Sequence, residues 1–119
     1  MTTADALDHD RVNALRDFGN DSGELLAAML ADFLVEAPQL VTEIEAAMST
    51  QSHDAAARAA HRLRGITGHI GATRLGDIAS QVEIAAGTGF PVGSAALVAA
   101  ARVELGLAVT AACVLLAQP

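Results

Sequence analysis

Apolar residues recur at intervals of three and four along most of the 119-residue chain, the spacing expected of helices with one buried face. The pattern resumes directly after Pro38, so we expect either one long helix kinked near Ala37 or two abutting helices. The clearest run comprises Leu25, Leu26, Met29, Leu30, Phe33 and Leu34.

Glycine, serine and proline divide the chain into further helical stretches, with a tight turn at Gly71. Residues that commonly cap helices stand at the start of three of these stretches: Asp21 or Ser22, Ser52 or Asp54, and Ser94. Besides the helix around Pro38, we expect helices over residues 5–18, 53–69, 73–86 and 94–117.

Short loops between long helices favour antiparallel neighbours. The chain is 52% hydrophobic and has only three aromatic residues, so it relies on alanine and leucine, which favour helices. We therefore predict an all-α fold, an antiparallel up-and-down four-helix bundle with an extra short N-terminal helix. Its length suits a single domain over residues 1–119, and its start at Met1 and full set of helices favour a protein that stands alone.

The apolar stretch from Ser94 to Gln118 is interpreted as a core helix and not a membrane span. Arg102 and Glu104 interrupt it, and the uncharged run that follows is about 13 residues, where a span needs about 20. The acidic N-terminus has no signal-peptide pattern, so we expect a cytoplasmic protein. The single cysteine, Cys113, excludes a disulfide framework, and we expect it to be buried and inert.

Charge is unevenly distributed along the chain. The net charge is −7, which makes the protein a poor ligand for nucleic acid or an anionic membrane. Residues 55–76 nevertheless contain no acidic residue, which predicts a local basic patch. Its members are Arg58, Arg62, Arg64 and Arg74.

His61 is the candidate reactive residue. On a helical wheel centred on the apolar position Leu63, His61 lies about 160° away and faces solvent. Gly65 and Gly68 lie beside it, although each costs about 1 kcal/mol relative to alanine in a helix. We interpret the glycines as leaving space for another protein to bring a reactive group close to the imidazole. Arg64 supplies a positive charge that suits a phosphoryl group, which the imidazole would attack.

Other interpretations of these residues remain open. His61 is alternatively an ordinary surface histidine, and the two glycines alternatively permit close helix packing. His53, His61 and His69 are spaced by eight residues, about 80° and about 12 Å apart on a helix, so we expect no shared metal ion.

Residues 60–75 resemble the signature of histidine-containing phosphotransfer (HPt) domains, roughly A-H-x-L-K-G-x-x-x-x-[LIV]-G-A-x-x-L. The chain reads AHRLRGITGHIGATRL there, and the likeness extends over residues 20–90. The resemblance implies a four-helix bundle in which His61 is the phosphorylated histidine and Gly65 is the small residue beside it. It also implies that Glu83 accepts a hydrogen bond from the imidazole and leaves Nε2 free.

The chain departs from the family pattern at two positions. Arg64 stands where lysine is usual, and His69 stands where asparagine or glutamine is usual. A guanidinium is a planar fork and an ammonium is a point charge, so this arginine is expected to alter partner choice or the lifetime of phosphohistidine.

The resemblance implies a phosphohistidine carrier and not an ATP-dependent kinase, since no Walker sequence is present. Its expected partners are response-regulator receiver domains, including that of a hybrid sensor kinase, and the receiver supplies Mg²⁺ while this chain needs no cofactor. We expect docking around His61 by Arg58, Arg62, Gly68, His69 and Leu or Met side chains exposed on the long helix around Pro38. We expect a monomer, although the apolar last helix leaves room for self-association. The alternative function is a non-catalytic helical scaffold whose histidine is not phosphorylated and which binds a receiver domain or associates with itself.

Overall fold

The computed structural model describes residues 3–17 and 23–118, and over these ranges the regular structure is entirely helical. A short 3₁₀ helix precedes five α-helices. They are η1 (Thr3–Ala6), α1 (His9–Asp17), α2 (Glu24–Ser49), α3 (His53–Ile70), α4 (Thr73–Gly87) and α5 (Ser94–Ala117).

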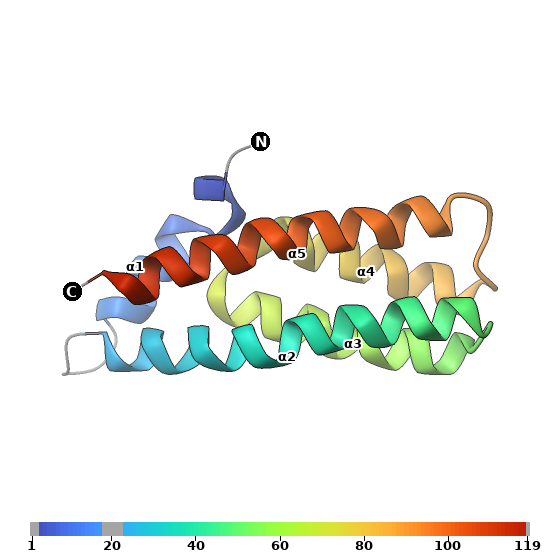
Figure 1. Ribbon diagram of the computed structural model, residues 1–119, viewed down its shortest axis with the longest axis horizontal. Helices are drawn as coiled ribbons and strands as arrows, with labels where there is room; N and C mark the ends of the chain where they lie inside the picture. The colour runs from blue at the N-terminus through green and yellow to red at the C-terminus, as the bar shows by residue number, and fades with distance from the viewer. Residues whose placement is uncertain (1–2, 18–22, 119) are drawn as a thin grey trace.

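Helices α2 to α5 form an antiparallel bundle, in which each helix packs against the next and α5 returns to α2 (Figure 1). The predicted four-helix bundle is therefore confirmed, and η1 and α1 lie at one end of it. Apolar side chains from α2, α3 and α4 fill the centre. The largest fully buried ones are Phe33, Leu30, Ile44, Leu63, Ile70 and Leu75.

The predicted single helix over residues 5–18 is wrong in its first part, because the chain forms η1 and then restarts as α1. Asp8 causes the break. Its side chain accepts a hydrogen bond from the Asp10 N–H at 3.1 Å, as a helix cap does, and its own N–H donates to Gly71 O at 2.7 Å. Residue 18 lies outside the described part of the chain.

Helix α2 continues past Pro38 as one helix, so the alternative of two abutting helices is wrong. Pro38 has no N–H to donate to the preceding turn, yet buried side chains before and after it hold the helix in the core. The helix begins after Gly23, whose φ of 86° is left-handed, and the proposed caps at positions 21 and 22 lie outside the described residues.

Gly71 ends α3 with a φ of 75°, which confirms the predicted tight turn. A Cβ at this position would lie 2.9 Å from the Cβ atoms of both Asp8 and Arg11, so glycine also allows the N-terminal segment to approach. The capping prediction for Ser94 is wrong: Ser94 is the first residue of α5, and its hydroxyl donates to Pro91 O at 2.7 Å. Ser52 precedes α3 but makes no side-chain cap bond.

Helices α2 and α5 are long and apolar enough to cross a membrane by length and composition, a test that core helices also pass. In this fold α5 packs on α2 and α4, and both of its charges are engaged: Arg102 with Glu45, and Glu104 with Arg74. Cys113 is exposed, so the expectation of a buried cysteine is wrong. The cause is that α5 is apolar nearly all round, and its sequence pattern does not mark the inner face.

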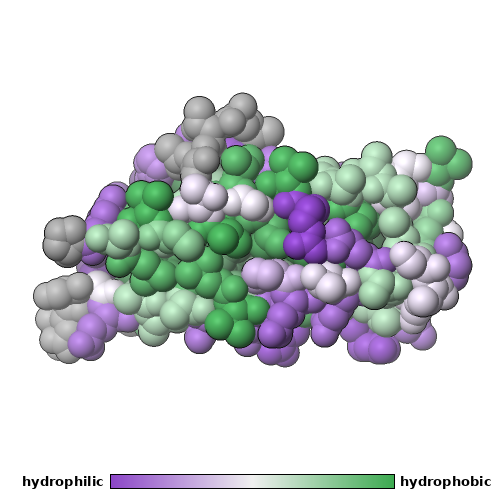
Figure 2. Space-filling view, viewed as in Figure 1, coloured by the Kyte–Doolittle hydropathy of each residue, from purple (hydrophilic) through white to green (hydrophobic). Residues whose placement is uncertain are grey.

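Part of this apolar surface remains uncovered. Figure 2 shows apolar side chains gathered over the ends of α5 and α2 that lie nearest α1. A hollow of about 440 Å³ lies there between α1 and the end of α5, lined by residues that include Val12, Val114 and Leu115. Val103 and Val114 are among the large apolar residues exposed on α5.

Candidate functional site

His61 lies on the solvent side of α3, opposite the fully buried Leu63. The strong amphipathic pattern of α3 fixes this rotation, because the apolar stripe must face the core. The His61 side chain is 65% exposed. The structure therefore places this imidazole where the sequence pattern predicts it, accessible to another molecule.

Gly65 and Gly68 lie exposed on the same side of α3, one and two turns beyond His61. A Cβ built at either glycine would meet no heavy atom within 4 Å outside its own helix. No neighbouring helix of the bundle therefore requires glycine at these positions, and the close-packing interpretation is wrong. The two positions leave bare helix surface beside the imidazole.

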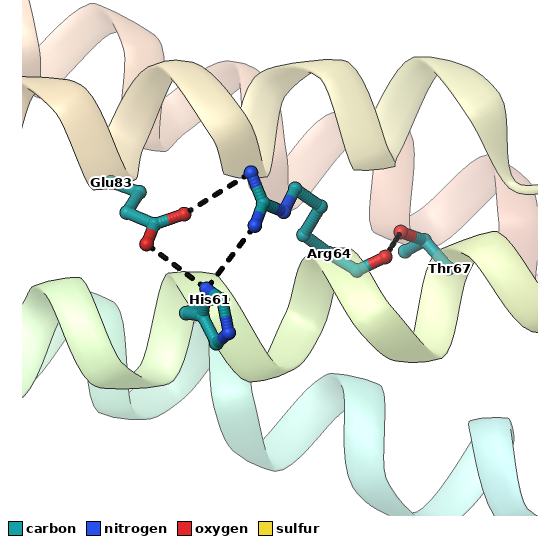
Figure 3. Close-up of polar contacts among 4 residues, drawn as sticks. All are labelled: His61, Arg64, Thr67 and Glu83. Carbon is teal, nitrogen blue, oxygen red and sulfur yellow. Dashed lines mark hydrogen bonds and ion pairs between the residues drawn. The ribbon is translucent and has the colours of Figure 1, made fainter.

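Glu83 reaches His61 from the neighbouring helix α4. Its Oε2 atom lies 3.0 Å from His61 Nδ1, as the family resemblance implies (Figure 3). The carboxylate is 30% exposed, so it is partly shielded between α3 and α4. A carboxylate on Nδ1 orients the ring and leaves Nε2 free of this contact.

Arg64 completes a triangle with these two residues. Its Nη1 lies 3.6 Å from Glu83 Oε1, and its Nη2 lies 3.3 Å from His61 Nδ1 (Figure 3). The guanidinium thus contacts the imidazole and its carboxylate partner at once. The sequence suggested a positive charge near the ring but did not indicate that Arg64 would share Glu83 with it.

The close approach of α4 to α3 depends on Gly76, which the sequence analysis did not single out. A Cβ at position 76 would lie 2.7 Å from the Thr67 hydroxyl oxygen. That hydroxyl donates to Arg64 O at 2.8 Å, so it is fixed in place (Figure 3). Glu83 lies seven residues, or about two turns, after Gly76 and shares its side of α4.

A hollow of about 400 Å³ between α2 and α3 flanks the site on one side. The bare surface at Gly65 and the His69 side chain border it on α3. Met29, Asp32 and Glu36 border it on α2, and Glu36 lies 3.5 Å from Arg62 Nη2 across it. Acidic side chains of α2 therefore form one wall of this hollow beside the site.

A second hollow, of about 420 Å³, lies on the opposite side between α3 and α4. Gly68 and Arg64 line it, together with Gly76. Arg58 lies about one turn before His61 on α3, where it lines a hollow with Arg62 and Glu43. The predicted docking residues thus spread over both flanks of His61.

The predicted basic patch is wrong in one member. Arg74, at the start of α4, turns away from His61. Its Nε donates to Glu104 Oε2 on α5 at 2.9 Å, and its Nη1 donates to Asp5 O in η1 at 3.0 Å. Arg74 and Glu104 are only 22% and 10% exposed, so the pair belongs to the interior of the fold. The exposed arginines near His61 are Arg58, Arg62 and Arg64.

Within residues 3–17 and 23–118, no three or more His, Cys, Asp or Glu side chains form a group that could hold a metal ion. Three of the predicted site residues form a contact group of an imidazole, a carboxylate and a guanidinium: His61, Glu83 and Arg64. This arrangement suits the transfer of an anionic group to or from the imidazole.

Comparison with known proteins agrees with this geometry. The family model described as "Hpt domain" matches residues 28–112, which is well over half of the chain. A search of the curated proteins gives no match. Among solved structures, the chain resembles the crystal structure of histidine-containing phosphotransfer protein B from Pseudomonas aeruginosa PAO1, with a TM-score of 0.82 and 20% identity over 92% of this chain and 93% of that one.

This chain belongs to the Hpt domain family, the histidine phosphotransfer domains of two-component phosphorelays. The structural likeness, at 20% identity, adds that the fold is shared over nearly the whole of both chains. The kind of partner that goes with the family is a receiver domain.

Proposed function

We propose that this protein relays phosphoryl groups between aspartates of response-regulator receiver domains through phosphohistidine at His61. The observation that carries the proposal is the contact of 3.0 Å between His61 Nδ1 and Glu83 Oε2 on an imidazole that is 65% exposed. With the Nδ1 proton held by the carboxylate, the lone pair of Nε2 is available for attack.

The transfer proceeds by displacement at phosphorus. The Nε2 lone pair of His61 forms the N–P bond as the P–O bond to the receiver aspartate breaks, and the bonding electrons leave with the aspartate carboxylate. The Nδ1 proton stays on the ring, which becomes a phosphorylated imidazolium. Glu83 faces that positive charge. Transfer to a second receiver reverses these bond changes, so no proton has to be gained or lost.

Arg64 is proposed to bind the oxygens of the phosphoryl group during transfer. Its guanidinium is 49% exposed and lies within one turn of His61 on the same helix. Arginine pairs with phosphate through two parallel N–H donors, which aligns the group as well as neutralising it. Mg²⁺ is proposed to come from the receiver domain, and this chain is proposed to need no cofactor of its own.

Docking is proposed to use the surface around His61. Gly65 and Gly68 allow the backbone of a receiver to approach the imidazole, because no side chain stands there. Arg58, Arg62 and His69 supply positive charge or hydrogen-bond donors at the rim. We further propose that the protein acts in the cytoplasm as a monomer, where receiver domains are accessible to it.

The test uses receiver domains charged with a small radioactive phosphodonor and mixed with this protein. Acid-labile, base-stable label on the wild-type protein, absent from His61→Gln, supports the relay. His53→Gln is the matched control, an exposed histidine on the same helix but outside the proposed docking surface, and it should still be labelled. Equal labelling of His61→Gln would remove His61 from the mechanism. No labelling across a full panel of receivers, with binding retained, would favour the scaffold function.

A further inference from the structure

The Nδ1 atom of His61 contacts one hydrogen-bond acceptor and one hydrogen-bond donor, and the two contacts require different protonation of Nδ1. Glu83 Oε2, at 3.0 Å, is a hydrogen-bond acceptor and requires a hydrogen on Nδ1. Arg64 Nη2, at 3.3 Å, is a donor and requires a lone pair on Nδ1. A neutral imidazole satisfies only one of these contacts at a time.

Each contact therefore favours a different tautomer of the ring. With the hydrogen on Nδ1, the Glu83 contact forms and Nε2 carries the lone pair that a nucleophile needs. With the hydrogen on Nε2, the Arg64 contact forms and Nε2 cannot attack phosphorus. The contacts to Arg64 and to Glu83 therefore favour opposite reactivities at Nε2.

We propose that Arg64 is a positioning residue that holds part of the resting protein in the unreactive Nε2–H tautomer and releases it when an anionic group draws the guanidinium away. This inference rests on the proposed function of His61 and adds a control on its nucleophile. On release, the ring loses its Nε2 proton to water and gains one from water at Nδ1. Glu83 then accepts the Nδ1 hydrogen, and the number of protons is unchanged.

The shape and exposure of Arg64 suit this role. Its planar fork places Nη1 near Glu83 and Nη2 near His61 simultaneously, which the single ammonium of a lysine cannot do in the same way. The side chain is 49% exposed, and both of these contacts are longer than 3.2 Å. A phosphoryl group offers a guanidinium shorter, charge-assisted hydrogen bonds, so its arrival favours departure from Nδ1.

The experiment measures the tautomer of His61 by ¹⁵N NMR of the histidine-labelled, unphosphorylated protein at pH about 8.5, where imidazole is neutral. Arg64→Met keeps an aliphatic side chain and removes the donors. We expect it to raise the ratio of Nδ1–H to Nε2–H roughly threefold or more, within the range measured for exposed charged contacts. Glu83→Ala should lower the same ratio, because the acceptor at Nδ1 is lost.

Arg62→Met is the matched control, because Arg62 lies on the same helix but pairs with Glu36 on α2. It removes the same charge and should leave the tautomer ratio of His61 unchanged. An unchanged ratio in Arg64→Met, or in Glu83→Ala, would overturn the proposal. The measurement needs no receiver and no phosphate, so its result is independent of the labelling assay that tests the proposed relay.

Discussion

Gly76 on α4 faces Thr67 on α3 with no room for a side chain between them, since a Cβ at position 76 would lie 2.7 Å from the Thr67 hydroxyl oxygen. Helix α4 also carries Glu83, so the spacing set at Gly76 helps to determine how far Glu83 stands from His61. A glycine remote from the imidazole thereby contributes to its environment.

We expect Gly76→Ala to destabilise the protein by about 1–3 kcal/mol, because an added methyl group forces α4 away from α3. Urea unfolding measures this loss. Thr67→Ala removes the hydroxyl that the new methyl would meet, so the double variant should be more stable than the sum of the two single effects predicts. Strict additivity would contradict a direct clash between the two positions.

At Gly65 we expect opposite results for small and large side chains. Gly65→Ala should stabilise the protein by about 0.5–1 kcal/mol, because alanine favours an exposed helix position and meets no neighbour. Gly65→Phe should fold but lose phosphotransfer from a charged receiver, because its ring covers the surface beside His61. Thermal unfolding and the labelling assay separate the two effects. Transfer by Gly65→Phe at the wild-type rate would disprove the need for clearance.

Glu83→Ala should slow phosphorylation of His61 by about ten- to a hundredfold, the usual cost of losing a group that orients a reactive histidine. Rapid-quench kinetics with a charged receiver would measure the rate. Glu83→Gln retains an oxygen that can accept the Nδ1 hydrogen but has no charge, so its rate should lie between those of the wild type and Glu83→Ala. A full rate for Glu83→Ala would show that the carboxylate does not act on the ring.

The ion pair between Arg74 and Glu104 is mostly buried, so removing one partner should be costly. We expect Glu104→Ala to lower the free energy of unfolding by about 1.5–3 kcal/mol, because it removes the carboxylate that accepts from the mostly buried Arg74 guanidinium, which then keeps its bond to Asp5 O. Glu45→Ala is the control, since the Glu45–Arg102 pair on the surface should contribute less than about 1 kcal/mol. Equal losses in the two variants would contradict the difference in burial.

The Glu45 pair should also make a small contribution to stability that depends on pH. A hydrogen bond from Arg102 lowers the pKa of the Glu45 carboxyl. A carboxyl with a lowered pKa in the folded state stabilises the protein above its unfolded pKa and loses that contribution as the pH falls through its folded pKa. The stability difference between wild type and Glu45→Gln, measured by urea unfolding, should therefore be constant near neutrality and shrink below about pH 4.

The helices and the exposed imidazole were predictable because both depend on local periodicity. A strong apolar stripe on α3 fixes which side faces solvent, and this placed His61, Gly65 and Gly68 correctly. The family resemblance supplied Glu83, which periodicity alone does not indicate. The weak pattern of α5 gave no such guide, and Cys113 was misplaced for that reason.

Contacts between helices were not predictable from the sequence. Arg74 was assigned to a surface patch because its neighbours in sequence are basic, but the rotation of α4 turns it toward Glu104 on α5. The roles of Gly76 and of the Arg64–Glu83 contact likewise depend on how α3 and α4 are rotated and spaced. Such information resides in tertiary packing, which single-helix patterns do not encode.

The N-terminal segment is bonded to the turn between α3 and α4. The Asp8 N–H donates to Gly71 O at 2.7 Å, and Arg11 Nε donates to His69 O at 3.0 Å. Residues 8 and 11 precede the region matched by the family model, which starts at residue 28. A fragment cut to residues 28–112 would therefore lose both hydrogen bonds that hold the carboxyl end of α3, the helix that carries His61. The segment needed to fold this end of the bundle is thus longer than the segment by which the family is recognised.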